Sequence, residues 1–318
     1  GAGDSKTAMY LNFLAIGGNL VLDPLLIFGV GPFPELGVAG AALATVLGYT
    51  MSMVLGLYWL AGDHGSISLS LADAGFDLDE LREMVDIGLP SAGQRLASQS
   101  VRLVVVAIVT VVGGAAGLAA YTVGARIATI AFVPATGLQQ AGQSVVGQNL
   151  GADRPDRARR ATWIGVGIAV GALTLIGVVQ LLIPDLLTRV FVPDISAQGQ
   201  AYAVRYLEIL AYGYWAIGAT YMLLGGLNGA RRTKTSLIVD LVKYWGIRLP
   251  IAVLALPVGL GVGAFGLSVA PGLGWGMDAI FWAVTGSNVA AALGLAVYFK
   301  YATGGGMMDR AADVAAAD

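Results

Sequence analysis

The stretch AMYLNFLAIGGNLVLDPLLIFGVG, residues 8–31, decides the fold class of this chain, because it is long and apolar. Its single charged residue is Asp23. A helix that crosses the hydrocarbon core of a membrane needs about 20 consecutive apolar residues. A carboxylate near the middle of such a helix costs roughly 2.5–3.5 kcal/mol on insertion. We therefore predict a membrane helix in which Asp23 has a function, and the first hypothesis is a site for a coupling ion or a proton.

Similar apolar blocks recur through all 318 residues. Hydrophobic residues make up 57% of the chain and charged residues 12%, whereas a soluble domain carries about 25% charged residues. We therefore predict an all-α polytopic membrane protein. Its eight predicted transmembrane helices cover residues 8–30, 37–61, 85–112, 117–147, 158–192, 200–228, 235–263 and 273–301.

Residue types that are scarce exclude several kinds of site. Cysteine is absent and His64 is the only histidine, so a disulfide framework, a thiolate metal site and a His-based metal centre are excluded. The net charge is −2 and the basic residues are grouped in loops, which is typical of membrane topology and not of nucleic-acid binding. The chain contains no GxxxxGK[ST], HExxH or GxSxG motif, so ATP hydrolysis is not expected and an intramembrane enzyme is the weakest alternative.

The basic residues outside the predicted spans gather in alternate loops. The loops near residues 31–36, 113–116, 190–199 and 262–272 hold at most Arg189, at a helix end. The positive-inside rule places the other loops in the cytoplasm. Both chain ends are then expected to be cytoplasmic, in a multi-pass protein of the plasma membrane. The basic residues of the predicted cytoplasmic loops are Lys6, Arg82, Arg154, Arg157, Arg159, Arg160, Arg231, Arg232, Lys234, Lys300 and Arg310.

A short internal repeat predicts more helices than the chain contains. Residues 1–7, GAGDSKT, correspond to residues 229–235, GARRTKT, and six predicted spans separate the two copies. An even number of spans leaves both halves in the same orientation, which is the parallel repeat arrangement. If the second half begins near residue 85, about 140 residues, or four helices, are expected in front of Gly1. The complete protein would then have twelve helices in two six-helix lobes.

Six segments, taken together and in order, resemble the multidrug and toxic compound extrusion (MATE) family of cation-coupled exporters. They are GAGDSKT (1–7), NLVLDPLLIFG (19–29), GVAGAALAT (37–45), DIGLPSAGQ (86–94), GLQQAGQSVVGQNLGA (137–152) and WGIRLP (245–250). The resemblance implies the last two helices of an N-lobe at 1–62, a cytoplasmic linker between lobes at 63–84, a six-helix C-lobe at 85–301 and a cytoplasmic tail at 302–318.

The resemblance also implies a function. It is secondary active export of organic, often cationic, compounds in exchange for Na⁺ or H⁺, by alternating access to a V-shaped cavity between the lobes. No cofactor other than the coupling ion is expected. The expected partners are the lipid bilayer and small organic substrates, without nucleic acid, and we expect a monomer. The alternative within the same superfamily is a lipid-linked saccharide flippase, which intramembrane arginines would suit.

Asn19 and Asp23 are the first candidate site. They are four residues apart and share one face of a helix. Pro24 has no N–H, so the carbonyl of Leu20 loses its helical partner. Carboxylate, amide and carbonyl oxygens are hard ligands that suit Na⁺, and the carboxylate also suits a proton. The alternative is an aspartate that only bonds to a neighbouring helix. The resemblance implies that Asn19 and Asp23 belong to the N-lobe cation site, with Thr45 as a further member.

Candidate cavity-lining residues of the C-lobe form a second group. Some members of the family have a glutamate after the GLP motif, where this chain has Gln94 and Ser98, so an acidic C-lobe cation site is in doubt. We expect the intramembrane arginines to form interhelical ion pairs with Glu208 or Asp278. If they lined the cavity instead, they would favour an anionic group such as a phosphate. The candidates are Gln94, Arg95, Ser98, Arg102, Gln139 and Gln143, and Arg126 is a third intramembrane arginine.

Asp240 and Lys243 are spaced i, i+3 in a later predicted helix. This spacing places the two side chains within reach of each other on one helix face. We therefore predict a local ion pair close to the cytoplasmic interface.

Overall fold

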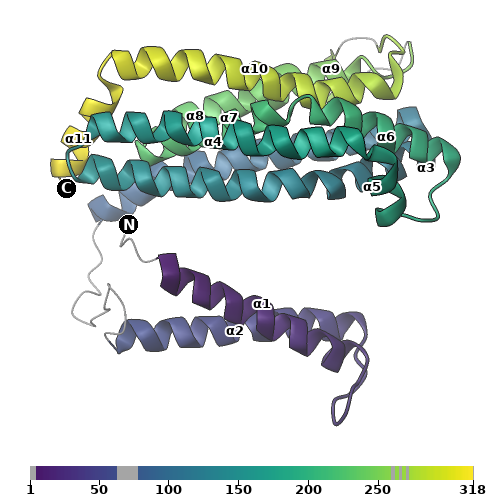
Figure 1. Cartoon of the computed structure of the whole chain (residues 1–318), viewed down its shortest axis with the longest axis horizontal. Coiled ribbons are helices and arrows are strands. Elements are labelled where there is room, and N and C mark those ends of the chain that lie inside the picture. The colour runs from purple at the N-terminus through teal and green to yellow at the C-terminus, as the bar shows by residue number, and fades with distance from the viewer. Residues whose placement is uncertain (1–4, 63–77, 259–261, 265–266, 270–271, 318) are drawn as a thin grey trace. The chain divides into compact units, whose positions relative to one another are not determined.

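The computed structural model describes residues 5–62, 78–258, 262–264, 267–269 and 272–317 (Figure 1). The chain divides into two compact units, Gly1–Leu78 and Asp79–Asp318. Most of the described residues are helical, as predicted. The assignment of the two units to an N-lobe and a C-lobe stays a prediction.

The first unit consists of two long helices packed side by side (Figure 1). They are α1 (Ser5–Ile27) and α2 (Val38–Ala61). The backbone of the connecting turn bonds back to the end of α1, with Leu36 N–H donating to the Leu26 carbonyl at 3.0 Å. Farther along the pair, the Ser52 hydroxyl donates to the Leu11 carbonyl at 2.8 Å. These bonds and close helix packing hold the pair together in a segment that is otherwise apolar.

The second unit begins with α3 (Leu78–Gly151), which is broken at Gly114. The backbone at Gly114 has φ 57° and ψ −152°, a conformation that glycine adopts readily because it has no Cβ. Residues from both halves of α3, such as Val105 and Ala131, belong to one hydrophobic core. The two halves therefore pack in the same bundle. An unbroken helix of this length would span about 110 Å, several times the thickness of a bilayer.

Shorter helices complete this bundle (Figure 1). They are α4 (Pro155–Leu182), α5 (Pro184–Phe191), α6 (Ala197–Ala211), α7 (Tyr214–Gly229), α8 (Thr233–Leu241), the π-helical segment η2 (Val242–Arg248), α9 (Leu249–Val253), α10 (Gly276–Gly304) and α11 (Met307–Ala317). Strands β1 (Val262–Ala264) and β2 (Leu267–Val269) form an antiparallel hairpin in which Gly263 is opposite Ser268.

Several predicted spans differ from the observed elements. The span 158–192 is divided because Pro184, which cannot donate a helical hydrogen bond, begins α5. The span 200–228 is bent by 53° between α6 and α7. The span 235–263 is helical only to Val253 and is followed by the hairpin. The predicted tail, 302–318, contains the helix α11.

Length and hydropathy identify the helices of the described residues that could cross a membrane. Five helices are long and apolar enough to cross a membrane, or six if the bent pair α6–α7 forms one span, and α3 is counted once in that number. The prediction of eight transmembrane helices is therefore not confirmed and stays a prediction.

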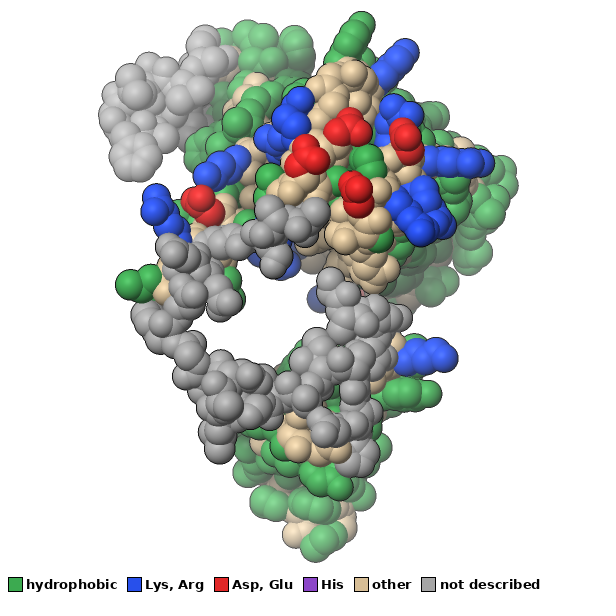
Figure 2. Space-filling model, turned by 90° about the vertical axis from the view of Figure 1, so that its left-hand side faces the viewer, with side chains coloured by type: hydrophobic (Ala, Val, Ile, Leu, Met, Phe, Trp, Pro, Cys, Tyr) green, Lys and Arg blue, Asp and Glu red, His purple; other side chains and the backbone are tan. Residues whose placement is uncertain are grey.

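Charged side chains gather at one end of the second unit. Figure 2 shows this end, where Lys and Arg side chains surround a smaller group of acidic ones. The start of α3 and the start of α8 meet here, and Lys234 Nζ lies 3.3 Å from Asp86 Oδ1. Residues that the sequence places in separate cytoplasmic loops therefore share one face of this unit.

Candidate functional site

The first candidate site joins α1 to α2 through three polar side chains. Asn19 Nδ2 lies 3.4 Å from Asp23 Oδ1 and 3.2 Å from Thr45 Oγ1. With the Asn19 amide turned over, its nitrogen donates to Asp23 Oδ2 at 3.2 Å, and its oxygen accepts from the Thr45 N–H and hydroxyl, each at 3.2 Å. Either orientation makes Asn19 the bridge between Asp23 and α2. The structure thus brings together the three residues of the predicted cation site.

Backbone features of both helices position this site. Pro24 lies inside α1 and has no N–H to offer the carbonyl of Leu20. On α2, a Cβ added at Gly48 would lie 2.7 Å from the Ala15 carbonyl oxygen and 3.1 Å from the Asn19 backbone nitrogen. Only glycine therefore allows the two helices to approach this closely beside Asn19. Asn19 and Asp23 are half-buried within the first unit, so the carboxylate keeps access to an ion.

The second candidate site is a cavity of about 570 Å³ in the second unit. Its size lies within the range of cavities that hold small organic ligands, about 300–1,000 Å³. Five of the six predicted cavity-lining residues are there, while Arg102 is not among the lining residues. The lining residues are Ser91, Gln94, Arg95, Ser98, Thr136, Gln139, Gln140, Gln143, Tyr221, Leu224, Asn228, Asp240, Lys243 and Tyr244.

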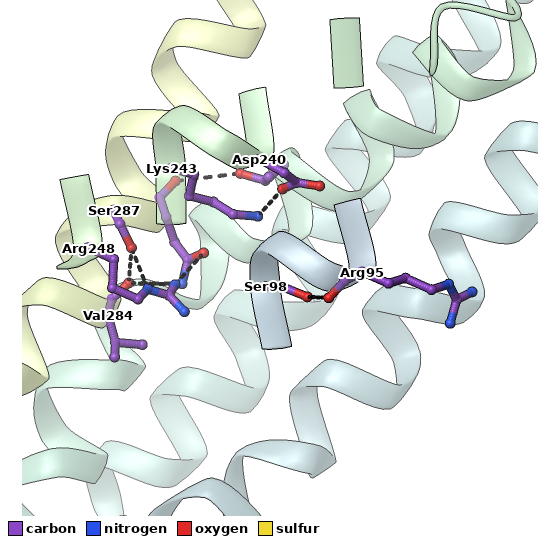
Figure 3. A network of polar contacts seen from close by, with 9 residues as sticks. Arg95, Ser98, Asp240, Lys243, Arg248, Val284 and Ser287 are labelled. Atoms are coloured by element: carbon purple, nitrogen blue, oxygen red, sulfur yellow. Dashed lines mark hydrogen bonds and ion pairs between the residues drawn. The ribbon is translucent and has the colours of Figure 1, made fainter. Parts of the chain in front are cut away.

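One wall of this cavity carries a buried ion pair. Lys243 Nζ lies 2.6 Å from Asp240 Oδ1, and the two side chains are 3% and 9% exposed (Figure 3). The predicted local ion pair is thereby confirmed. The ammonium also lies 4.3 Å from the centre of the Tyr244 ring, a cation–π distance. The buried ammonium therefore has both a carboxylate and an aromatic face as partners.

The helix that carries Lys243 departs from α-helical geometry. Residues Val242–Arg248 form a π-helical segment, a rare element that occurs often at functional sites. At its end, Arg248 Nε donates to the Ser287 hydroxyl of α10 at 2.9 Å. The Arg248 guanidinium also lies 4.7 Å from the centre of the Tyr244 ring. The segment therefore presents Lys243 to the cavity and anchors Arg248 on α10.

The predicted ion pairs of the intramembrane arginines are wrong. Asp278 accepts from Arg205, with 3.1 Å between Arg205 Nε and Asp278 Oδ2, and Glu208 lies 3.6 Å from the same guanidinium. Arg205 reaches both because Glu208 follows it by one helical turn and because α6 packs against α10, where Asp278 lies in the first turn. The sequence gives no sign of the contact between Arg205 and Asp278, because the two residues are far apart in the chain.

Arg95, Arg102 and Arg126 form no ion pair with another residue of the described ranges. Their side chains are exposed in the second unit. In Figure 3 the Arg95 side chain extends away from Asp240 and Lys243. Because these guanidinium groups are not buried inside the second unit, its packing does not force an acidic partner on them.

The sequence prediction missed more than half of the cavity wall. Asn228, Asp240, Lys243 and Tyr244 reach it from α7, α8 and η2, far along the chain from Gln94. The sequence offered one signal for this part of the wall, the charged pair Asp240 and Lys243 inside an apolar span. Charged residues within membrane spans usually face the bundle interior or a cavity.

Comparisons with known proteins agree with this architecture. The MatE family model matches residues 90–254. The FAD transporter of Shewanella oneidensis is 29% identical over 79% of this chain and 55% of its own length. The probable multidrug resistance protein NorM of Brucella suis is 32% identical over 82% of this chain and 56% of its own length. The chain therefore spans about half the length of these relatives.

Solved structures share the fold. The structure entitled "Crystal structure of MATE in complex with MaL6" superposes with a TM-score of 0.82 and 22% identity, over 94% of this chain and 63% of the other. This chain belongs to the MatE family, as the six sequence segments indicated. The relatives it matches are transporters, and its long apolar helices are those of a multi-pass membrane protein.

Proposed function

We propose that the complete protein exports small organic compounds in exchange for Na⁺ or H⁺, by alternating access, and that Asp23 binds the coupling ion. The observation that carries the proposal is the contact of Asn19 with both Asp23 and Thr45. In this contact a carboxylate and an amide of α1 meet a hydroxyl of α2 in an otherwise apolar helix pair. These are ligands for Na⁺, and the carboxylate is also a proton acceptor.

Coupling follows from the cost of an intramembrane charge. Binding of Na⁺ or a proton neutralises Asp23 and lowers the free energy of any conformation that removes this side chain from water. A ligand shifts a conformational equilibrium only by its differential affinity for the two states. Asp23 therefore drives transport if one state of the protein binds the cation more tightly than the other.

The orientation in the membrane is part of the proposal. The basic end of the second unit, which Figure 2 shows, would face the cytoplasm, because positively charged loops are retained there. Both chain ends would then be cytoplasmic and the membrane would be the plasma membrane.

A lipid-linked saccharide flippase is the second candidate function. It is supported by Arg95 in the cavity wall, since an arginine without an acidic partner suits a phosphate group. The contact of Asp23 with Asn19 supports the exporter more strongly, because it holds a carboxylate beside an amide, a set of ligands that suits Na⁺.

The test is ion-driven dye efflux from proteoliposomes that contain the complete protein. Asp23→Asn removes the charge and keeps the size of the side chain, so we expect export driven by a Na⁺ or H⁺ gradient to fall to background while the variant inserts normally. The matched control is Glu35→Gln in the exposed loop of the same unit, which should transport like the wild type. Undiminished transport by Asp23→Asn would refute the coupling role. Running each gradient alone identifies the ion.

A further inference from the structure

The cavity of the second unit contains polar atoms that the protein leaves without a partner. Gln94 Nε2 and Asn228 Oδ1 are buried and accept or donate no hydrogen bond within the described residues. Both residues line this cavity. An unpaired buried polar atom costs free energy, and such atoms in native structures commonly serve a ligand or ordered water. Asp240 Oδ1 also lacks a partner by hydrogen-bond geometry, but the ammonium of Lys243 lies 2.6 Å from it and compensates it. Of the two atoms that remain, Gln94 Nε2 is a donor and Asn228 Oδ1 an acceptor, so a ligand that satisfies both must carry an acceptor and a donor.

The charges of the cavity wall add up to a positive excess. Its ionisable residues are Arg95, Lys243 and Asp240, and the last two neutralise each other at 2.6 Å. Arg95 extends away from this pair, so Asp240 does not compensate its guanidinium (Figure 3). A guanidinium presents two parallel N–H donors, which match a carboxylate or a phosphate. The uncompensated charge therefore favours an anionic ligand and disfavours a cation.

Neutral amides form most of the remaining polar wall. The second half of α3 contributes Gln139, Gln140 and Gln143 to the cavity wall, and the first half contributes Gln94. Amides donate and accept, so they can bind hydroxyl, amine or carbonyl groups of a ligand without selecting its charge. The selection for charge is left to Arg95.

We propose that this cavity binds a polar organic anion, one that carries a carboxylate or phosphate beside hydroxyl, amine or amide groups. Arg95 binds the anionic group, Gln94 donates a hydrogen bond to it, and Asn228 accepts one from a hydroxyl or amine of the ligand. The buried pair of Lys243 and Asp240 forms a neutral floor. The inference rests on the proposed export function only in treating this anion as a transported substrate; binding itself does not depend on ion coupling.

Equilibrium binding of two matched dyes tests this. The complete protein is placed in phosphatidylcholine nanodiscs without an ion gradient, and fluorescence anisotropy is measured with 6-carboxyfluorescein and with rhodamine 6G. The dyes share a xanthene ring, but the first is an anion and the second a cation. We expect the anion to bind at least tenfold more tightly. Equal affinities, or tighter binding of rhodamine 6G, would overturn the inference.

Three variants locate the binding site. Arg95→Gln should weaken binding of 6-carboxyfluorescein about tenfold or more, and Arg95→Lys should restore part of the loss because it keeps the charge. The matched control is Arg126→Gln, another exposed arginine of α3 that does not line the cavity, and it should bind like the wild type. An equal loss in Arg95→Gln and Arg126→Gln would show a diffuse electrostatic effect and contradict the site.

A lipid headgroup could supply the same phosphate chemistry as a soluble compound. Nanodiscs that contain added phosphatidylglycerol separate the two sources. Displacement of 6-carboxyfluorescein by this lipid, dependent on Arg95, identifies the headgroup as the anion and supports the flippase candidate. Binding that the lipid leaves unchanged identifies a soluble anion.

Failure of this inference can be told apart from failure of the proposed function. Asp23→Asn should bind 6-carboxyfluorescein normally while losing ion-driven transport. Transport of a cationic dye that depends on Asp23, without binding of the anion, would leave the proposed function intact and reject this inference. Binding of the anion without ion-driven transport would reject the proposed function and leave this inference intact.

Discussion

The ammonium of Lys243 lies 2.6 Å from the carboxylate of Asp240, and both side chains are almost completely buried. Burying two charges costs several kcal/mol each, which their attraction offsets only when the geometry is close. The pair is local, because the two residues are three apart in a helical segment. Loss of either charge would leave the other buried in the cavity wall without a counter-charge.

Breaking this pair should destabilise the protein strongly. We expect Asp240→Asn to lower the free energy of unfolding by about 3–5 kcal/mol, because Lys243 is left buried without its counter-charge. The double variant Asp240→Leu/Lys243→Met removes both charges and should regain most of this loss. Unfolding in detergent, followed by tryptophan fluorescence, measures both. The control is Asp156→Asn, which breaks the exposed pair with Arg159 and should cost at most about 1 kcal/mol. A double variant less stable than Asp240→Asn would contradict the prediction.

Close approach of α1 and α2 at Gly48 should be necessary for ion coupling. In Gly48→Ala, the new Cβ would lie 2.7 Å from the Ala15 carbonyl oxygen, so the helices must separate. We expect this separation to break the contact of Asn19 with Thr45 and to reduce ion-driven transport at least tenfold, with an overpacking cost of about 1–3 kcal/mol. The control Gly17→Ala adds the same methyl group to α1 where nothing lies within 4 Å, and should transport normally. Equal transport by the two variants would show that the helix spacing is not critical.

A buried polar bridge should contribute to the stability of the second unit. Tyr214 donates its hydroxyl to Gln180 Oε1 at 2.8 Å, and Gln180 Nε2 donates to the Leu207 carbonyl at 2.7 Å, which links α4, α6 and α7. We expect Tyr214→Phe to cost about 1–3 kcal/mol, because it leaves the buried Gln180 oxygen without a donor. The exposed Tyr212→Phe is the control and should change stability by less than about 0.5 kcal/mol. Thermal unfolding of both variants in detergent checks the difference, and identical melting curves would contradict it.

Local features of the fold and the site could be predicted from the sequence. The long apolar blocks predicted membrane helices, because about 20 consecutive apolar residues match the length of a helix that crosses a bilayer. Asn19 and Asp23 were expected on one face, and Asp240 was expected beside Lys243, because spacings of three and four residues bring side chains together in any helix. The motif set also indicated the MatE family, which the family model confirms.

Contacts between distant segments were decided by the tertiary structure. Glu208 and Asp278 were expected beside the arginines of α3, but packing of α6 on α10 brings Asp278 to Arg205 instead. Packing of other helices gathers Gln94, Asn228 and Lys243 around one cavity, although α3, α7 and η2 are far apart in the chain. Periodicity within a helix reports which residues share a face, but not which helix that face meets. The sequence by itself therefore determined the membrane class, the family and the pairs within one helical turn, whereas only packing between helices decided the partners of the charges and the lining of the cavity.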